Sequence, residues 1–150
     1  MNELQLLRSR RDAARAGTLE VLSRFEDSDL AFRPFDGGRD VGAAFRHIAH
    51  EEAIEVHWGL ARLLDEMPPE PPSRVDGTEA VRELLARAQA VTDSYLDGLG
   101  PDALDDEVEM AWGDTMRRGD QLWHVLEHEL HHRGELSLAL GLLGRKGLDA

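Results

Sequence analysis

The sequence contains no cysteine. A chain without cysteine forms no disulfides, has no thiolate nucleophile of its own and cannot bind a metal through sulfur. Any thiol chemistry would therefore need a thiol supplied from outside the protein. With 150 residues, the chain is still long enough to bury a core without cross-links. We expect one domain that spans residues 1–150.

Basic residues are also scarce. Lys and Arg number 17 against 30 Asp and Glu, which gives a formal net charge of -13. Binding to phosphate needs a basic face, so neither a nucleic acid nor an anionic membrane is an expected partner. Residues 1–17 lack the continuous apolar core of a signal peptide, and no apolar run approaches the length of a membrane span. These absences predict a cytoplasmic protein.

Apolar residues recur at helical spacing in four long segments, each bounded by capping or helix-breaking residues. The pattern predicts an all-α fold, in which four amphipathic helices form a bundle. The predicted helices are Asn2–Phe25, a second helix capped by Asp40 that runs to about Glu66, Glu79–Asp97 capped by Thr78, and Asp120–Leu143.

The connections between these helices differ in character. Glu26–Arg39 predicts a loop with one short turn, whose Phe32 and Phe35 close the end of the core. Met67–Gly77 holds four prolines, which favour an extended polyproline conformation. Such a Pro-rich crossover spans about 34 Å at about 3.1 Å per residue, so the second and third helices can run parallel. Pro101–Gly119 predicts a long loop or a weak hairpin.

Several polar residues stand where the apolar pattern expects a core side chain. Arg11 and Thr18 occupy such positions in the first helix. Glu51 and Glu52 interrupt the centre of the second helix, where an uncompensated carboxylate would be costly. The face that carries these glutamates is therefore either hydrated or directed at a cation.

The last helix concentrates four of the seven histidines. On a helical wheel, His128 and His132 point along the same apolar stripe as Val125, Leu136 and Leu140. Two rings one turn apart need two sets of polar partners, and a divalent cation supplies both at once. The residues therefore predict a metal site, and imidazole ligands without cysteine favour Zn²⁺, Ni²⁺ or Fe²⁺.

The same stretch spells His128-Glu129-x-x-His132, the spacing found in zinc peptidases. A peptidase of that kind needs a third ligand downstream, yet only 18 residues follow His132 and none is histidine. The glycine of the extended motif is also absent, because position 135 is Glu. The missing context disfavours a peptidase.

The order of these features resembles the DinB/YfiT-like superfamily of metalloenzymes. The resemblance rests on Val41-Gly42 followed by His47-Ile48-Ala49, and on the run from Leu122 to Leu136. It implies a four-helix bundle, often a homodimer, in which His47, His128 and His132 bind zinc, nickel or a similar ion such as iron or manganese. Some relatives transfer thiols such as bacillithiol or mycothiol. This sequence departs from the pattern in its additional histidines, His50, His124 and His131.

A site with three imidazoles leaves the ion its positive charge and an open position. We therefore expect a small-molecule reaction in which an exogenous thiol is activated for transfer to an electrophile. Glu51 or Glu129 would take the proton or orient a ligand histidine. Trp112, Met116, Arg117 and Arg118 are candidates for a lip that binds the thiol cofactor.

The sequence leaves two alternative functions open: metal-assisted hydrolysis with Glu129 as the base, and a non-catalytic metal-binding stress protein.

Leu138 and Leu142 form a second apolar face at the end of the last helix. A monomer would leave that face in contact with water, so the sequence also predicts a homodimer.

Overall fold

Four long helices make up most of the chain in the computed structural model, which describes residues 1–72 and 77–148. They are α1 (Glu3–Ser23), α2 (Val41–Glu52), α3 (Gly77–Asp97) and α4 (Arg118–Leu142). Shorter elements are the 3₁₀ turns η1 (Asp27–Ala31) and η3 (Ala103–Asp105), the π-helix η2 (Ala53–Leu60), and strands β1 (Glu107–Glu109) and β2 (Thr115–Arg117). The predicted all-α four-helix bundle is confirmed.

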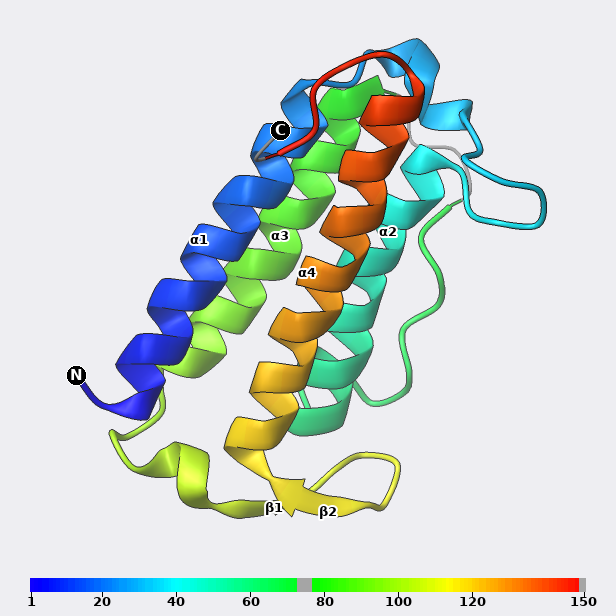
Figure 1. Ribbon diagram of the computed structural model, residues 1–150. Coiled ribbons are helices and arrows are strands. Elements are labelled where there is room, and N and C mark those ends of the chain that lie inside the picture. The colour runs from blue at the N-terminus through cyan, green and yellow to red at the C-terminus, as the bar shows by residue number, and fades with distance from the viewer. Residues whose placement is uncertain (73–76, 149–150) are drawn as a thin grey trace.

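The helices are arranged so that α1 and α4 run in one direction and α2 and α3 in the other (Figure 1). The expected parallel course of the second and third helices is therefore confirmed; residues 73–76 of the predicted crossover lie outside the described part of the chain. Helix α4 packs against both α1 and α2, and α2 packs against α3. No helix in the described ranges has the length and apolar character needed to cross a membrane.

Local capping explains where the helices begin. Asn2 and Gln5 form a reciprocal capping box at the start of α1. Asp40 accepts a hydrogen bond from the Ala43 N–H at 2.7 Å, as predicted for the cap of α2. The prediction of Thr78 as a cap is wrong: α3 begins at Gly77, and the Thr78 N–H donates to Asp27 Oδ1 of η1 at 2.8 Å.

The second helix ends earlier than its apolar pattern suggests. It changes into the π-helix η2 and stops at Leu60, not near Glu66. The Ala61 N–H donates to the Val56 carbonyl at 2.8 Å, and Arg62 adopts a left-handed backbone with φ of 52°. Leu63 consequently lies outside the helix and is 58% exposed, although the predicted helix to Glu66 included it.

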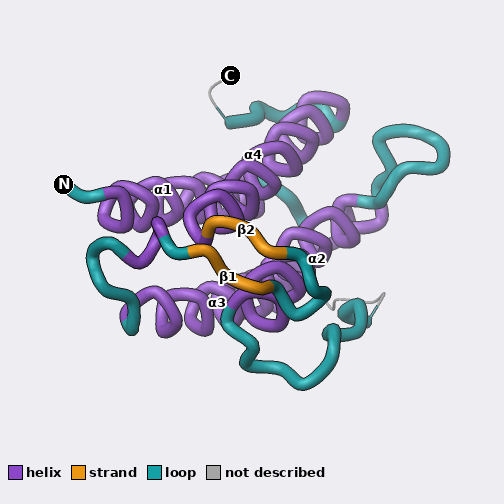
Figure 2. Tube along the Cα trace, turned by 90° about the horizontal axis from the view of Figure 1, so that it is seen from below, coloured by secondary structure: helices purple, strands orange, loops and turns teal. Residues whose placement is uncertain are grey.

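The segment before α4 forms the weak hairpin that its sequence pattern suggested. Strands β1 and β2 pair antiparallel with Val108 opposite Met116. Gly113 makes the turn with φ of +101°, a conformation that glycine adopts without strain. The hairpin lies across one end of the bundle (Figure 2).

A layer of buried polar groups divides the core into two apolar clusters. One cluster draws residues from all four long helices, and the other draws residues from α1, α3, α4 and the π-helix η2. Between them lie Arg11, Arg15 and Thr18 of α1, Glu52 of α2, His57 of η2, Thr92 of α3 and Glu129 of α4, all of them buried. The polar positions that interrupted the sequence pattern therefore face one another inside the bundle.

Arg15 is the centre of this layer because its guanidinium contacts every other long helix. It donates from Nη2 to Glu52 Oε2 at 2.6 Å and from Nε to Glu129 Oε1 at 2.9 Å. Its Nη1 donates to the Leu85 carbonyl of α3 at 2.7 Å. Arg11 adds a bond from Nη2 to Glu52 Oε1 at 2.7 Å. Two guanidinium groups thus balance two buried carboxylates.

The charges in this layer stabilise each other's ionised forms. Burial alone would raise the pKa of Glu52, but the charges of Arg15 and Arg11 hold it below its ordinary value. Burial opposes the charge of Arg15 as well, yet Glu52 and Glu129 raise its pKa. The sequence left open whether Glu52 faces water or a cation. The structure shows that it faces two cations, and both are arginines.

The stability of the bundle should therefore depend on Arg15. In Arg15→Met the apolar stem is kept but a buried cation is lost, and breaking a buried pair costs about 3–5 kcal/mol. We expect a loss of that size in the free energy of unfolding, measured by urea denaturation. Arg10→Met, at an exposed position of the same helix, should change stability by less than about 0.5 kcal/mol. Equal stability of the two variants would show that the carboxylates do not depend on Arg15.

Candidate metal centre

Three histidine side chains from two helices converge on one point. Nε2 of His128 lies 3.0 Å from Nε2 of His47 and 3.1 Å from Nε2 of His132. The three donor atoms all lie within 4.8 Å of one another. Two nitrogens that are each about 2.0–2.1 Å from a single ion lie about 2.9–3.4 Å apart, so these separations fit a shared ion.

Helix geometry brings the rings together. His128 and His132 stand one turn apart on the face of α4 that looks at α2, and their ring centroids are 4.4 Å apart. His47 approaches from α2 with its ring edge-on to both, at centroid distances of 4.8 and 4.6 Å. His132 is buried and the other two are half-buried.

The protons available to these rings do not satisfy all three nitrogens. His132 Nδ1 lies 2.8 Å from Glu135 Oε2 and donates to it, so Nε2 of neutral His132 carries a lone pair. His128 Nε2 has one proton at most, so it can donate to His132 or to His47 but not to both. One contact therefore lacks a hydrogen unless a ring is charged, and a cation removes this deficit.

Burial keeps two of the rings neutral. It lowers the pKa of His47 to about 4, with the positive charge of Arg39 as the next cause. Burial also lowers the pKa of His128 to about 4, helped by the neighbouring His132. Both rings are consequently unprotonated at neutral pH and carry free lone pairs, as metal ligation requires.

Two carboxylates lie near the ring nitrogens of His132 and His47 that point away from the shared centre. Glu135 accepts from His132 Nδ1 and also lies 3.1 Å from His131 Nε2. Glu51 Oε1 lies 3.9 Å from Nδ1 of His47. A carboxylate that accepts a hydrogen bond from a ring nitrogen, as Glu135 does, fixes the ring tautomer and raises the basicity of the other nitrogen, whereas Glu51 lies beyond hydrogen-bond distance. Glu135 was missed as a site residue from the sequence, although its spacing of three from His132 is the available signal.

Glu129 points away from this centre. Its carboxylate accepts from Arg15 and, through Oε1, from the Thr18 hydroxyl at 2.7 Å. Successive residues of a helix are about 100° apart around its axis, so Glu129 faces α1 while His128 faces α2. The structure therefore does not support Glu129 as a base, because its oxygens are already bound by buried donors.

The remaining histidines have other partners. Nε2 of His50 lies 3.0 Å from the Pro68 carbonyl, and Nε2 of His57 lies 3.0 Å from the Thr92 hydroxyl. His131 pairs with Glu135, and His124 is exposed. The three converging rings are therefore the candidate ligand set that joins two helices, whereas His131, His132 and Glu135 form a second, more exposed group on α4 whose ligand atoms also lie within 4.8 Å of one another.

The residues that the sequence suggested as a cover over the site lie at the N-terminal end of α4 and in the hairpin before it. Arg117 pairs with Glu3, Asp105 and Asp120, and Arg118 pairs with Asp106. The Trp112 ring packs so closely on Gly59 that a Cβ there would overlap it. Arg118 begins α4 and stands about 15 Å along the helix from His128, at about 1.5 Å per residue. The structure thus places Arg117, Arg118 and Trp112, which the sequence suggested as cofactor-binding residues, where they attach the hairpin to the end of the bundle.

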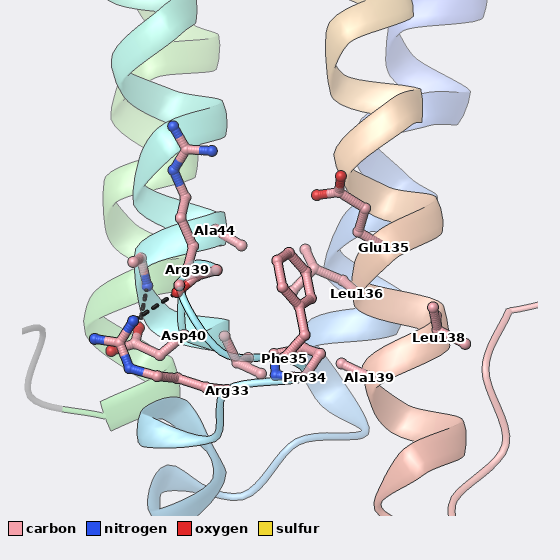
Figure 3. A pocket seen from close by; sticks show the side chains of 14 residues that line it. Arg33, Pro34, Phe35, Arg39, Asp40, Ala44, Glu135, Leu136, Leu138 and Ala139 are labelled. Atoms are coloured by element: carbon pink, nitrogen blue, oxygen red, sulfur yellow. Dashed lines mark hydrogen bonds between the residues drawn. The ribbon is translucent and has the colours of Figure 1, made fainter.

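One cavity is lined by two of the histidines, and a second reaches the carboxylate that His132 contacts. One, of about 360 Å³, is lined by His47 and His50 together with Arg39 and Arg46. The other, of about 600 Å³, lies between the start of α2 and the second half of α4 and reaches Glu135 (Figure 3). Arg39 lines both. A small molecule in the smaller cavity can contact His47 directly, whereas the larger cavity meets the centre at Glu135.

Comparison with known proteins identifies the fold. Residues 7–136 match the family model of the DinB superfamily. A DinB-like protein from Bacillus cereus has a TM-score of 0.78 at 15% identity, covering 99% of this chain and 95% of that one. A DinB-like protein from Bacillus subtilis has a TM-score of 0.75 at 17% identity, covering 97% and 96%.

A mycothiol-dependent maleylpyruvate isomerase is also similar, with a TM-score of 0.58 at 21% identity. The match covers 89% of this chain but 65% of the isomerase. None of the curated proteins matches the chain. At these identities the structural likeness establishes a shared bundle fold.

Each of the three histidines should be needed for metal binding. We expect His47→Ala, His128→Ala and His132→Ala to lose more affinity than the roughly 10–100-fold that follows loss of a ligand's hydrogen-bond partner. Elemental analysis after dialysis measures the bound metal, and circular dichroism should show an intact bundle because the helices bury their own apolar faces. His124→Ala, an exposed change on the same helix, should retain the ion. Full occupancy in His47→Ala would exclude α2 from the site.

Proposed function

The chain belongs to the DinB superfamily, and on that basis we propose that it is a metal-dependent enzyme that activates an exogenous low-molecular-weight thiol for transfer to an electrophile. The observation that carries the proposal is the convergence of three imidazole nitrogens, from His47, His128 and His132, with one cavity at His47 and another at Glu135. A group transfer needs one activating centre and room for two reactants.

The three histidines would hold a divalent ion, with zinc or nickel favoured by imidazole nitrogen and iron or manganese as alternatives. When bound, such an ion acts as a Lewis acid that lowers the pKa of a coordinated thiol or water. Glu135 would keep the Nδ1 proton on His132, so that its Nε2 faces the ion.

The thiol must come from solution because the chain has no cysteine. A structural relative is mycothiol-dependent by its name, and this chain shares the bundle that makes up about two thirds of that protein, 65% of its length. Bacillithiol and mycothiol are accordingly the thiols that we propose first. Transfer to an electrophile uses the same nucleophile that a thiol-dependent isomerisation requires.

Glu51 is the carboxylate that we propose as acceptor of the thiol proton. Its side chain is 26% exposed and lies beside His47, so it can exchange protons with solvent. Hydrolysis remains chemically available to such a centre, but its expected base, Glu129, is held by Arg15 and Thr18. We therefore place thiol transfer ahead of hydrolysis and of a purely metal-binding stress protein.

Metal-loaded protein should accelerate conjugation of bacillithiol, mycothiol or glutathione to a chromogenic electrophile. His128→Ala should abolish the acceleration. Glu51→Gln should lower kcat by about 10²-fold or more at unchanged metal content, since general base catalysis contributes at least that much. Glu83→Gln, an exposed change on α3, serves as the control. Absence of metal-dependent turnover with all three thiols would favour the non-catalytic alternative.

We also propose that the protein is a homodimer through the end of α4. Leu138 and Leu142 are 63% and 57% exposed on one face of the helix, and such neighbouring apolar side chains favour burial against a partner. Light scattering at micromolar concentration should give twice the chain mass. Leu142→Glu should shift the protein toward the monomer, whereas Leu63→Glu, at an exposed leucine outside the bundle helices, should not. A monomeric wild-type protein would contradict the proposal.

A further inference from the structure

The larger cavity has the composition of a small-molecule site. It occupies about 600 Å³ between the loop before α2 and the second half of α4, within the range of ligand pockets. Its walls are largely apolar and include Phe35, Val41, Ala44, Leu136 and Ala139. One end reaches Glu135, the residue that holds His132. A molecule in this cavity can therefore contact Glu135, the carboxylate that joins the cavity to His132 of the candidate metal centre.

Most charged groups of the cavity already have partners. Asp40 caps α2, and the Arg33 guanidinium donates to the Gly38 carbonyl. Glu135 accepts from His131 and His132. Arg39, in contrast, makes no ion pair or hydrogen bond with any other residue in the described ranges. Among the described residues, both guanidinium groups of the cavity therefore lack an ion pair, and Arg39 is the one without a hydrogen-bond partner as well. This cation lies beside an apolar wall in a protein whose formal net charge is -13.

The position of Arg39 connects this charge to the reaction centre. Its side chain extends along α2, across the cavity from Glu135 (Figure 3). Its charge acts on both His47 and His128. Because a guanidinium binds carboxylate through two parallel hydrogen bonds, Arg39 is suited to fix the orientation of an acid next to the histidines.

Phe35 gives the cavity an aromatic wall that the sequence pattern had assigned to the core. That expectation is wrong, since its side chain is 68% exposed and stands between α2 and α4 (Figure 3). The surrounding loop holds it in place: a Cβ at Gly38 would come within 2.6 Å of the ring, and Gly37 supports the turn with φ of +77°. An exposed ring fixed over an apolar wall favours a ligand with an apolar body.

We propose that the larger cavity binds the electrophilic substrate, and that this substrate is an acid with an apolar body. The body packs against Phe35 and the apolar face of α4, and the acid group pairs with Arg39. The assignment of the ligand as the electrophile rests on the thiol-transfer function proposed above. The acid-binding property of the cavity rests on Arg39 and Phe35.

Isothermal titration calorimetry with two matched probes tests this assignment without turnover. The probes are 4-phenylbutyrate and its uncharged amide, added to metal-loaded protein. A charge-assisted hydrogen bond is worth about 10-fold or more in affinity, so the acid should bind at least that much more tightly than the amide. Arg39→Gln should remove this preference and leave amide binding unchanged. Phe35→Ala should weaken both probes equally.

The controls separate local effects from net charge and from the metal. Arg82→Gln makes the same charge change on α3, where Arg82 neighbours Glu79, and should leave both affinities unchanged. Elemental analysis should find equal metal in all variants. An acid preference that survives in Arg39→Gln would mean that the ion holds the acid, and it would overturn the assignment. Failure of both probes to bind would also overturn the assignment. So would a Phe35→Ala variant that dissociates a dimer but binds both probes with unchanged affinity.

The outcomes also distinguish the two proposals. Acid binding through Arg39 without any thiol turnover would refute thiol transfer and leave the cavity as an acid-binding site. Thiol turnover that shows no preference for acidic electrophiles, and no response to Arg39→Gln in KM, would refute the cavity assignment alone.

Discussion

The guanidinium of Arg15 is the group on which the arrangement of this bundle depends, because it bonds to each of the other three long helices. Apolar contact is non-directional, so the two apolar clusters alone would tolerate rotation of a helix about its axis. The buried ion pairs do not tolerate it. A quarter turn of α4 would withdraw Glu129 from Arg15 and leave a buried carboxylate without its cation, at a cost of several kcal/mol. The polar layer therefore selects one rotation and one register for α4 and α2.

That selection places the candidate metal centre. With Glu129 turned toward α1, the adjacent His128 must lie about 100° away around α4, on the side of α2. Glu52 fixes α2 in the same way and leaves His47 facing α4. The three imidazoles thus meet because the carboxylates near them in sequence are held by α1, a helix that itself contributes no ligand candidate. The arginines act as positioning residues for a site that they do not touch.

Sequence reasoning succeeded where the information is local and failed where it depends on packing. The four helices, the Asp40 cap, the hairpin and the shared face of His128 and His132 all follow from spacing within a few residues. His47 lies on another helix and could be added only through the family resemblance. Arg15 lies in a charged stretch of sequence that is typical of an exposed helix face, so its pairing with Glu52 could not be predicted from the sequence. The π-helix has no local signal, which is why α2 was expected to continue to Glu66. Arg117 and Arg118 are close to the histidine helix in sequence, but the rise of that helix carries them away from the site.

Carboxylates that are close in sequence have different roles, because the rotation of each helix places some in the buried polar layer and others beside the histidines. Glu51 and Glu52 are adjacent, yet Glu52 lies 2% exposed against two arginines while Glu51 lies beside His47 at the edge of the site. On α4, Glu129 belongs to the buried layer and Glu135 to the histidines. A substitution at Glu129 would release α4 from α1 and so disturb His128 and His132 indirectly. Loss of metal or activity in such a variant would therefore report on helix orientation, whereas a change at Glu51 or Glu135, which leaves the ion layer intact, reports on the centre itself.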